Sequence, residues 1–150
     1  GYNVKKLRYE IREILGLNSR NTAVLVGCGN MGQALLKNFD FEGCGFYMVA
    51  AFDRDPDKIA TQVGPVRVLD ISVLRRFVEA EKPCMAVLTV PRDAAADTAQ
   101  LLGEVGIQAI WNFTGCKLEV PEALVEDVSF SSSLLTLSYR LNQKKEEADG

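Results

Sequence analysis

The sequence predicts an α/β fold of the Rossmann type, in which helices cover both faces of a doubly wound, parallel sheet. Short apolar runs alternate with longer amphipathic stretches, as expected when strands are buried on both faces and helices on one. A glycine-rich turn follows the first of these runs, and an aspartate ends the second. A chain of 150 residues accommodates one such domain.

An amphipathic helix is expected before the first strand, over Tyr2–Leu15. Its apolar residues recur at spacings of three and four positions: Val4, Leu7, Ile11 and Ile14. Gly16 favours the end of this helix, because glycine readily adopts the left-handed conformation found there. Residues 1–20 are therefore predicted to form an N-terminal helix and hinge.

Five short apolar runs are typical of strands buried inside a sheet. They are Thr22–Val26, Phe46–Phe52, Val66–Leu69, Met85–Val90 and Ile107–Asn112. Helices are expected between them, from Gly32 to Phe39 and over Asp55–Gln62, Asp70–Lys82 and Pro91–Val105. Right-handed crossovers through these helices make the predicted sheet parallel.

The final third of the chain has a different pattern. A short strand is expected at Val125–Val128, followed by a helix over Ser131–Gln143 and a solvated tail. Four leucines of this helix are expected to be buried: Leu134, Leu135, Leu137 and Leu141. We therefore assign 21–130 to the Rossmann domain and 131–150 to a C-terminal dimerisation helix and tail.

The composition excludes several classes of function. Because the chain contains no histidine, Ser/His/Asp and Cys/His catalysis and histidine-ligated metals are excluded. Its four cysteines form no Cys-x-x-Cys pair, which favours free thiols over disulfides or a zinc site. A net charge of −3 argues against holding DNA by bulk electrostatics. We predict no catalytic residue and no metal. The absence of a long apolar run or secretory leader predicts a cytoplasmic protein.

The strongest motif is a glycine-rich turn at the expected junction of the first strand and its helix. The pattern GxGxxG is matched by Gly27, Cys28, Gly29, Asn30, Met31 and Gly32. Gly27 permits the tight turn, Gly29 lets the backbone approach a pyrophosphate, and Gly32 allows close packing of the helix on the sheet. The helix N-terminus offers free N–H groups to the phosphates. The motif predicts a dinucleotide site. The alternatives are a structural turn, or S-adenosylmethionine or coenzyme A as the ligand.

Asp53 lies 21 residues after Gly32, at the expected end of the next strand. A carboxylate there accepts hydrogen bonds from both hydroxyls of the adenosine ribose and repels a 2′-phosphate, which favours NAD(H) over NADP(H). Arg54 either stacks on the adenine or is a solvated arginine. Together with Lys58 it completes the candidate residues on this side.

Further candidates lie where two later strands end, because parallel strands present their carboxyl ends at one edge of the sheet. Thr89, Val90 and Pro91 are expected beside the nicotinamide half, and Asn112 is expected as a polar contact. Cys28 stands at a helix N-terminus, which can lower a thiol pKa. With no second cysteine nearby, we favour a small loop residue over a thiol sensor.

These motifs resemble the C-terminal part of the Rex family of redox-sensing transcriptional repressors. The similar blocks span the chain in order: GYNVKKL (1–7), VGCGNMGQALL (26–36), VAAFDRDPDKIA (49–60), LTVP (88–91), GIQAIWNF (106–113), LEVPEALVEDVSF (118–130) and LSYRL (137–141). The resemblance implies an NAD(H)-binding and dimerisation domain that senses the NADH/NAD⁺ ratio. It also implies that operator DNA is released when NADH is bound.

The resemblance implies further features of the whole protein. Family members carry an N-terminal winged-helix DNA-binding domain that this sequence lacks, so we expect a part of a longer repressor that reaches operator DNA only through that domain. It implies a homodimer in which the C-terminal helix is exchanged between subunits, a domain swap that brings Phe130 to the partner's nicotinamide pocket. Many members carry Tyr where Asn38 stands and Asp where Ser129 stands, a pair implicated in relaying the redox state. That form of the relay is therefore in question here.

Two other classes remain open at this point. One is the nucleotide-binding domain of an NAD-dependent oxidoreductase whose catalytic residues lie elsewhere. The other is a coenzyme A-binding Rossmann domain.

Overall fold

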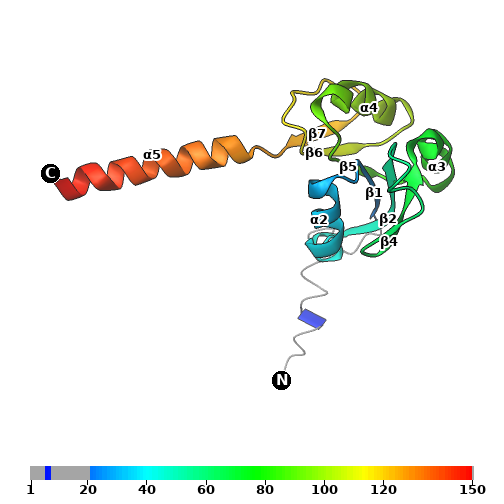
Figure 1. Cartoon of the computed structure of the whole chain (residues 1–150), viewed down its shortest axis with the longest axis horizontal. Coiled ribbons are helices and arrows are strands. Elements are labelled where there is room, and N and C mark those ends of the chain that lie inside the picture. Colours follow the sequence, from blue (N-terminus) through cyan, green and yellow to red (C-terminus); the bar gives the residue numbers. More distant parts are fainter. Residues whose placement is uncertain (1–5, 8–20, 150) are drawn as a thin grey trace.

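The computed structural model describes residues 6–7 and 21–149, which form a Rossmann-like α/β domain with one long projecting helix (Figure 1). Lys6 and Leu7 are helical, and the rest of the helix expected over Tyr2–Leu15 lies outside the described residues. The strands form one seven-stranded sheet. Its order is β3 (Gln62–Val63), β4 (Val66–Asp70), β2 (Phe46–Asp53), β1 (Asn21–Val26), β5 (Met85–Leu88), β6 (Ala109–Asn112) and β7 (Leu124–Asp127).

All neighbouring strands of this sheet are parallel except the short antiparallel pair β3–β4. The chain first builds outward from β1 through β2 to β4, and then crosses back to place β5 on the other side of β1. The reversal creates a crevice at the carboxyl ends of β1 and β5. Ligands of doubly wound folds bind at such a point.

Helices cover the sheet from both faces, as the apolar runs predict: α2 (Asn30–Asn38) on one face, and α3 (Leu74–Glu81) and α4 (Arg92–Glu104) on the other. A fourth helix, α5 (Phe130–Asp149), covers neither face, and 3₁₀ turns lie at Glu42–Cys44 and Ile71–Val73. Leu25 of β1 packs in the cluster that contains Leu36 of α2. Its neighbour Val24 packs in the opposite cluster, with Leu74 of α3 and Leu102 of α4. Successive β1 side chains thus serve two cores, and both must be apolar.

The prediction of a helix over Asp55–Gln62 is wrong. The chain forms consecutive turns there: the Ile59 N–H reaches the Asp55 carbonyl, but the Ala60 N–H instead donates to Val68 of β4 at 2.8 Å. Ala60 has a positive φ of 70°, which ends any helical path. Pairing with the neighbouring strand therefore overrides the local helix signals.

Smaller boundary differences occur elsewhere. Helix α2 begins at Asn30 rather than after Gly32, β5 ends at Leu88, and β6 begins at Ala109. The last strand, β7, lies one residue earlier than expected. Thr89 and Val90 therefore belong to the loop after β5 rather than to the strand itself.

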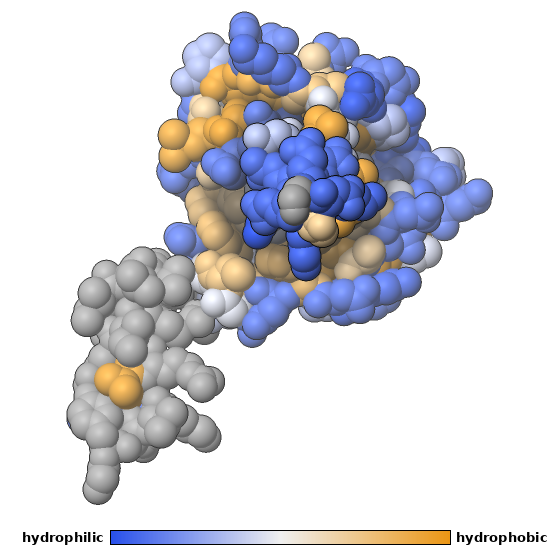
Figure 2. All heavy atoms as spheres, turned by 90° about the vertical axis from the view of Figure 1, so that its left-hand side faces the viewer, coloured by the Kyte–Doolittle hydropathy of each residue, from blue (hydrophilic) through white to orange (hydrophobic). Residues whose placement is uncertain are grey.

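The C-terminal helix differs most from expectation. Helix α5 runs to Asp149, through the residues expected to form a solvated tail, and it projects from the domain (Figure 1). Contrary to expectation its four leucines are exposed, by 51 to 70%. Figure 2 views the molecule with the hydrophilic end of α5 in front and apolar surface visible on the domain behind it. A single described chain leaves this helix without a packing partner for its leucines.

None of the helices in the described part of the chain is both long enough and apolar enough to span a membrane.

Candidate dinucleotide-binding site

The turn between β1 and α2 is built by three glycines with different surroundings. Gly27 has a φ of +103°, and a Cβ on it would lie 2.6 Å from the carbonyl carbon of Thr89. A Cβ on Gly32 would collide with the carbonyl oxygen of Gly27. Any side chain at these two positions would therefore push α2 away from the ends of β1 and β5.

Gly29 is different because nothing lies within 4 Å of where its Cβ would be. Its φ of −75° is one that any residue adopts, so neither packing nor backbone conformation requires glycine here. Gly29 is also the N-cap of α2, whose first turn presents unpaired N–H groups. The open space in front of it suits a group that approaches the backbone from outside the protein, such as a pyrophosphate.

The Asp53 carboxylate closes the turn from the end of β2. Its Oδ2 accepts the Cys28 N–H at 2.7 Å, and its Oδ1 accepts the Asp55 N–H at 2.8 Å. Each carboxylate oxygen offers two acceptor positions, so one remains on each for a ligand. Asp53 thus both fixes the glycine turn and keeps the acceptor capacity that two ribose hydroxyls need.

A cleft of about 470 Å³ brings these groups together at the carboxyl edge of the sheet. This volume lies within the range of roughly 300–1,000 Å³ that is usual for small-molecule sites. Its walls contain nine of the residues expected from sequence: Gly29, Asn30, Met31, Asp53, Arg54, Lys58, Thr89, Val90 and Pro91. Gly27, Cys28 and Gly32 belong to the same glycine-rich segment, but they are buried and do not line the cleft.

Sequence reasoning missed four residues that line this cleft: Asp55, Ile71, Ala94 and Thr98. Ile71 directly follows β4, so the rule that ligands bind at the ends of parallel strands would have found it. Ala94 and Thr98 lie one turn apart on α4 and share a face. The sequence of this Ala-rich helix contains no motif that indicates that this face borders a site.

Asn112 and Phe130 are expected contacts that the described chain does not bring to the cleft. The Asn112 side chain is buried, and all its hydrogen-bonding positions are occupied within the chain. The Phe130 ring stands at the start of α5, 59% exposed and 6.3 Å from the ring of Phe113. Neither residue lines the cleft of its own chain.

Asn38 and Ser129 replace the Tyr–Asp pair described above, and the structure shows where each of them lies. Asn38 is the exposed last residue of α2. Ser129 precedes α5, and its Oγ accepts the Ser132 N–H at 3.2 Å. An oxygen at this position caps the helix N-terminus, so serine here serves the start of α5.

The Cys28 thiol is fully buried under the glycine turn. Burial, and then the negative charge of Asp53, raise its pKa from 9.0 to about 11, although Lys58 acts in the opposite direction. The thiol therefore stays protonated at neutral pH. The helix N-terminus does not activate it, and the preferred reading as a small loop residue agrees with this environment.

We expect thiol reagents to distinguish Cys28 from Cys44. Because the thiolate is the reactive form, iodoacetamide at pH 8 should modify exposed Cys44 and leave Cys28 unmodified in the folded protein. Labelling of Cys28 should rise only as the pH approaches 11. Peptide mass spectrometry gives the site, and the unfolded chain, in which all four cysteines react, is the control. Rapid labelling of Cys28 at pH 8 would contradict this assignment.

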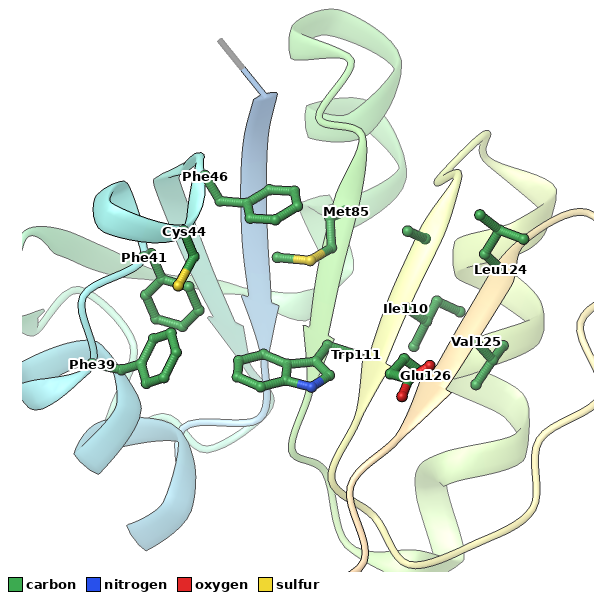
Figure 3. Close-up of a pocket in the computed structure, with 11 residues that line it drawn as sticks. Phe39, Phe41, Cys44, Phe46, Met85, Ile110, Trp111, Leu124, Val125 and Glu126 are labelled. Carbon is green, nitrogen blue, oxygen red and sulfur yellow. The ribbon is translucent and has the colours of Figure 1, made fainter. Parts of the chain in front are cut away.

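A second cleft, of about 540 Å³, lies on the α2 side of the sheet over β5, β6 and β7 (Figure 3). Aromatic and aliphatic side chains line it, among them Phe39, Phe41, Met85, Trp111 and Leu124. Glu126 is the one charged residue among the described residues that line it. Such a surface offers little to phosphates or ribose and suits contact with apolar protein surface. The groups that could hold a dinucleotide are in the first cleft.

Fold and site define a class: a Rossmann-type domain whose open glycine turn and strand-end carboxylate are arranged for a nucleotide. Residues 5–116 match the family model described as a CoA binding domain. The chain is 38% identical over 146 residues to the "Redox-sensing transcriptional repressor Rex" of Thermoanaerobacter sp. (strain X514), covering 97% of this chain and 65% of that protein. The Clostridioides difficile (strain 630) protein of the same description is 40% identical, with 97% and 70% covered.

Solved structures agree with these relatives. The crystal structure of RSP, a Rex-family repressor, superposes with a TM-score of 0.85 at 37% identity, covering 100% of this chain and 73% of that one. RSP in complex with NADH gives a TM-score of 0.86 at 36% identity, covering 99% and 72%. The chain belongs to the Rex family. It spans 65% of the length of the first curated relatives it matches.

Proposed function

We propose that this chain is the NAD(H)-binding and dimerisation domain of a redox-sensing transcriptional repressor that releases operator DNA when NADH is bound. The observation that carries the proposal is the open space at Gly29 facing the same cleft as the Asp53 carboxylate. Pyrophosphate at the α2 N-terminus and ribose hydroxyls on Asp53 account for both features. The related RSP repressor has been crystallised with NADH, and also with NAD⁺ and operator DNA.

The nicotinamide half lies beside Thr89, Val90 and Pro91 in this proposal. Val90 and Pro91 present apolar surface, and an uncharged reduced ring costs less to bury against such surface than a cationic oxidised ring. This difference favours NADH over NAD⁺. It supports a sensor in which occupancy follows the NADH/NAD⁺ ratio.

In this proposal residues 21–130 hold the cofactor and 131–150 serve dimerisation. The N-terminal helix and hinge expected over 1–20 lie outside the described residues, apart from the helical pair Lys6 and Leu7. The protein acts in the cytoplasm, where NADH and operator DNA are both present.

Titration with NADH and NAD⁺ separately, followed by calorimetry, tests the proposed function. We expect both to bind, NADH more tightly. Incubation with NADH and a panel of small carbonyl compounds tests the oxidoreductase alternative. The sensor should leave NADH unoxidised, since the chain has no histidine to serve as the common proton donor.

Coenzyme A is the second candidate ligand, because the matching family model is described by it. Its adenosine ribose carries a phosphate in place of one hydroxyl, which the Asp53 carboxylate would repel. We therefore expect coenzyme A not to displace NADH. Displacement at equal concentration would favour coenzyme A as the ligand.

Dimerisation through α5 is the next expectation. Phe130, Leu134, Leu137 and Leu141 share one face of the helix at spacings of four, three and four residues, and all are at least half exposed. That face and the second, apolar cleft are the apolar surfaces that a second copy can cover. We propose that the helix is exchanged between subunits, as in the domain swap expected above.

Light scattering at micromolar concentration should give a dimer, and Leu137→Glu should weaken it. A leucine lost from both copies of a symmetric interface removes about 3 kcal/mol or more, which is at least about 100-fold in the dissociation constant. Gln143→Glu adds the same charge at an exposed position on the opposite side of the helix and should leave the dimer intact. A monomeric wild-type chain, or equal effects of the two variants, would contradict the assignment.

The chain alone is expected not to bind operator DNA. A surface that follows phosphates needs several uncompensated basic side chains, and this chain is net negative at −3. Gel-shift assays at low salt should therefore show no sequence-selective complex. Tight, selective binding would overturn the proposed division of labour with a winged-helix domain.

A further inference from the structure

Asn112, the last residue of β6, has one of the most completely bonded side chains in the molecule. It is 1% exposed. Its Nδ2 donates to the Cys116 carbonyl and to Oδ1 of Asp127, both at 2.8 Å. Its Oδ1 accepts the Thr114 N–H at 3.0 Å and the Thr114 hydroxyl at 2.7 Å. Two donors and two acceptors are all that an amide side chain offers, so the bonds fix it in one orientation.

These bonds hold the β7–α5 junction. Asp127 is the last residue of β7, and Val128, which follows it, donates its N–H to the Asn112 backbone carbonyl at 2.9 Å. Asn112 is thus hydrogen-bonded to two successive residues, Asp127 and Val128, just before α5 begins at Phe130. The chain enters α5 directly after these bonded residues and Ser129.

The loop that Asn112 holds also contacts the start of α4, next to the cleft. Residues 113–116 form a loop beside the first turn of α4, where the Cys116 Sγ lies 3.9 Å from the Arg92 carbonyl oxygen. A Cβ on Gly115 would lie 2.9 Å from the Arg92 guanidinium. Arg92 follows Pro91, which lines the cleft. Asn112 is therefore bonded both to the loop that contacts Arg92, the neighbour of cleft residue Pro91, and to the residues just before α5.

We propose that Asn112 and Asp127 are positioning residues that fix Phe130 and the start of α5 relative to the nicotinamide side of the cleft. Neither lines the cleft, so neither contacts the cofactor within its own chain. They act by holding the aromatic pair Phe113 and Phe130 in place, with ring centroids 6.3 Å apart. The inference rests on the proposed function and adds the residues that set the geometry between cofactor and dimerisation helix.

Trp111 provides the measurement. It is the only tryptophan of the chain, it precedes Asn112, and its ring lies 4.6 Å from that of Phe113. Reduced nicotinamide absorbs where tryptophan emits, so energy transfer from Trp111 reports where the bound NADH ring lies. A substitution that only lowers stability would change neither this transfer at saturation nor the affinity of the folded fraction.

Asp127 is the residue to change, because it is the exposed end of the bond and replacing buried Asn112 would leave Thr114 and the loop unpaired. Asp127→Ala removes the acceptor. We expect it to weaken NADH binding by about three- to thirtyfold and to change the energy transfer at saturation. Asp127→Asn keeps an acceptor oxygen and removes only the charge, so it should bind NADH within about twofold of the wild type.

Three distinct results would overturn the inference. If the wild-type chain binds NADH and Asp127→Ala matches it in affinity and energy transfer, the positioning role fails while the proposed function stands. If the wild-type chain does not bind NADH, the proposed function fails and the inference fails with it. Equal losses in Asp127→Ala and Asp127→Asn would assign the effect to charge and also overturn the positioning role.

Discussion

Replacing Gly29 with aspartate should abolish NADH binding and leave the fold intact. Apart from Gly29 itself and its immediate chain neighbours, no atom of the described chain lies within 4 Å of the new Cβ, and aspartate is among the best N-cap residues for a helix such as α2. The side chain would instead occupy the space of the pyrophosphate and repel its charge. We expect a loss of at least about 100-fold in NADH affinity, close to 3 kcal/mol, measured by calorimetry.

The other glycines of the turn provide the matched controls. Gly27→Ala should lower the thermal unfolding temperature, because its Cβ meets backbone atoms of Thr89 and Val90 at under 3 Å in a positive-φ position. Gly29→Val adds bulk without charge, and it should also lose binding at a cost of only about 1 kcal/mol in stability. Normal folding and wild-type NADH affinity in both Gly29 variants would show that the pyrophosphate lies elsewhere.

A preference of at least about tenfold for NADH over NADPH is the second large effect, and it should depend on Asp53. The carboxylate keeps one free acceptor position on each oxygen for the ribose hydroxyls, and a 2′-phosphate would both remove a donor and add a like charge. Asp53→Asn should remove most of the preference. Calorimetric titration of each protein with both cofactors measures it.

The ratio of the two affinities is the decisive quantity in that experiment. Asp53 also accepts the Cys28 N–H, so a substitution loosens the glycine turn and weakens both cofactors alike. Only loss of the ribose contact changes the ratio. Equal affinities of the wild-type chain for NADH and NADPH would contradict the role of Asp53.

The parts of the fold and site that sequence reasoning found share one property: neighbours along the chain determine them. A strand segment buried on both faces must be apolar at every position, as in residues 23–26 of β1, and a turn that places backbone against backbone requires glycine, as at Gly27. The end of a strand locates Asp53 in the same way. These requirements are visible in a few consecutive residues.

The incorrect predictions concern residues whose structure depends on partners distant in the sequence. Residues 55–62 carry helix-start signals, yet pairing of Ala60 and Thr61 with Val68 prevents the helix. Asn112 was expected to face a ligand because it is polar and ends a strand. Its actual partner Asp127 lies 15 residues away, and no local pattern indicates that pairing. The leucines of α5 were expected to be buried, but no surface of the described chain covers them.

The helicity of α5 should depend on protein concentration. The helix has no buried residue, and beyond the contact of Phe130 with Phe113 the described chain offers little tertiary packing to offset the entropy of ordering its 20 residues. A helix of this length without packing is only marginally stable in water. In the dimer proposed above, association supplies the missing stabilisation, and the fraction of α5 that is helical then follows the law of mass action. Dilution below the dissociation constant of the dimer would melt the helix before it disturbed the sheet.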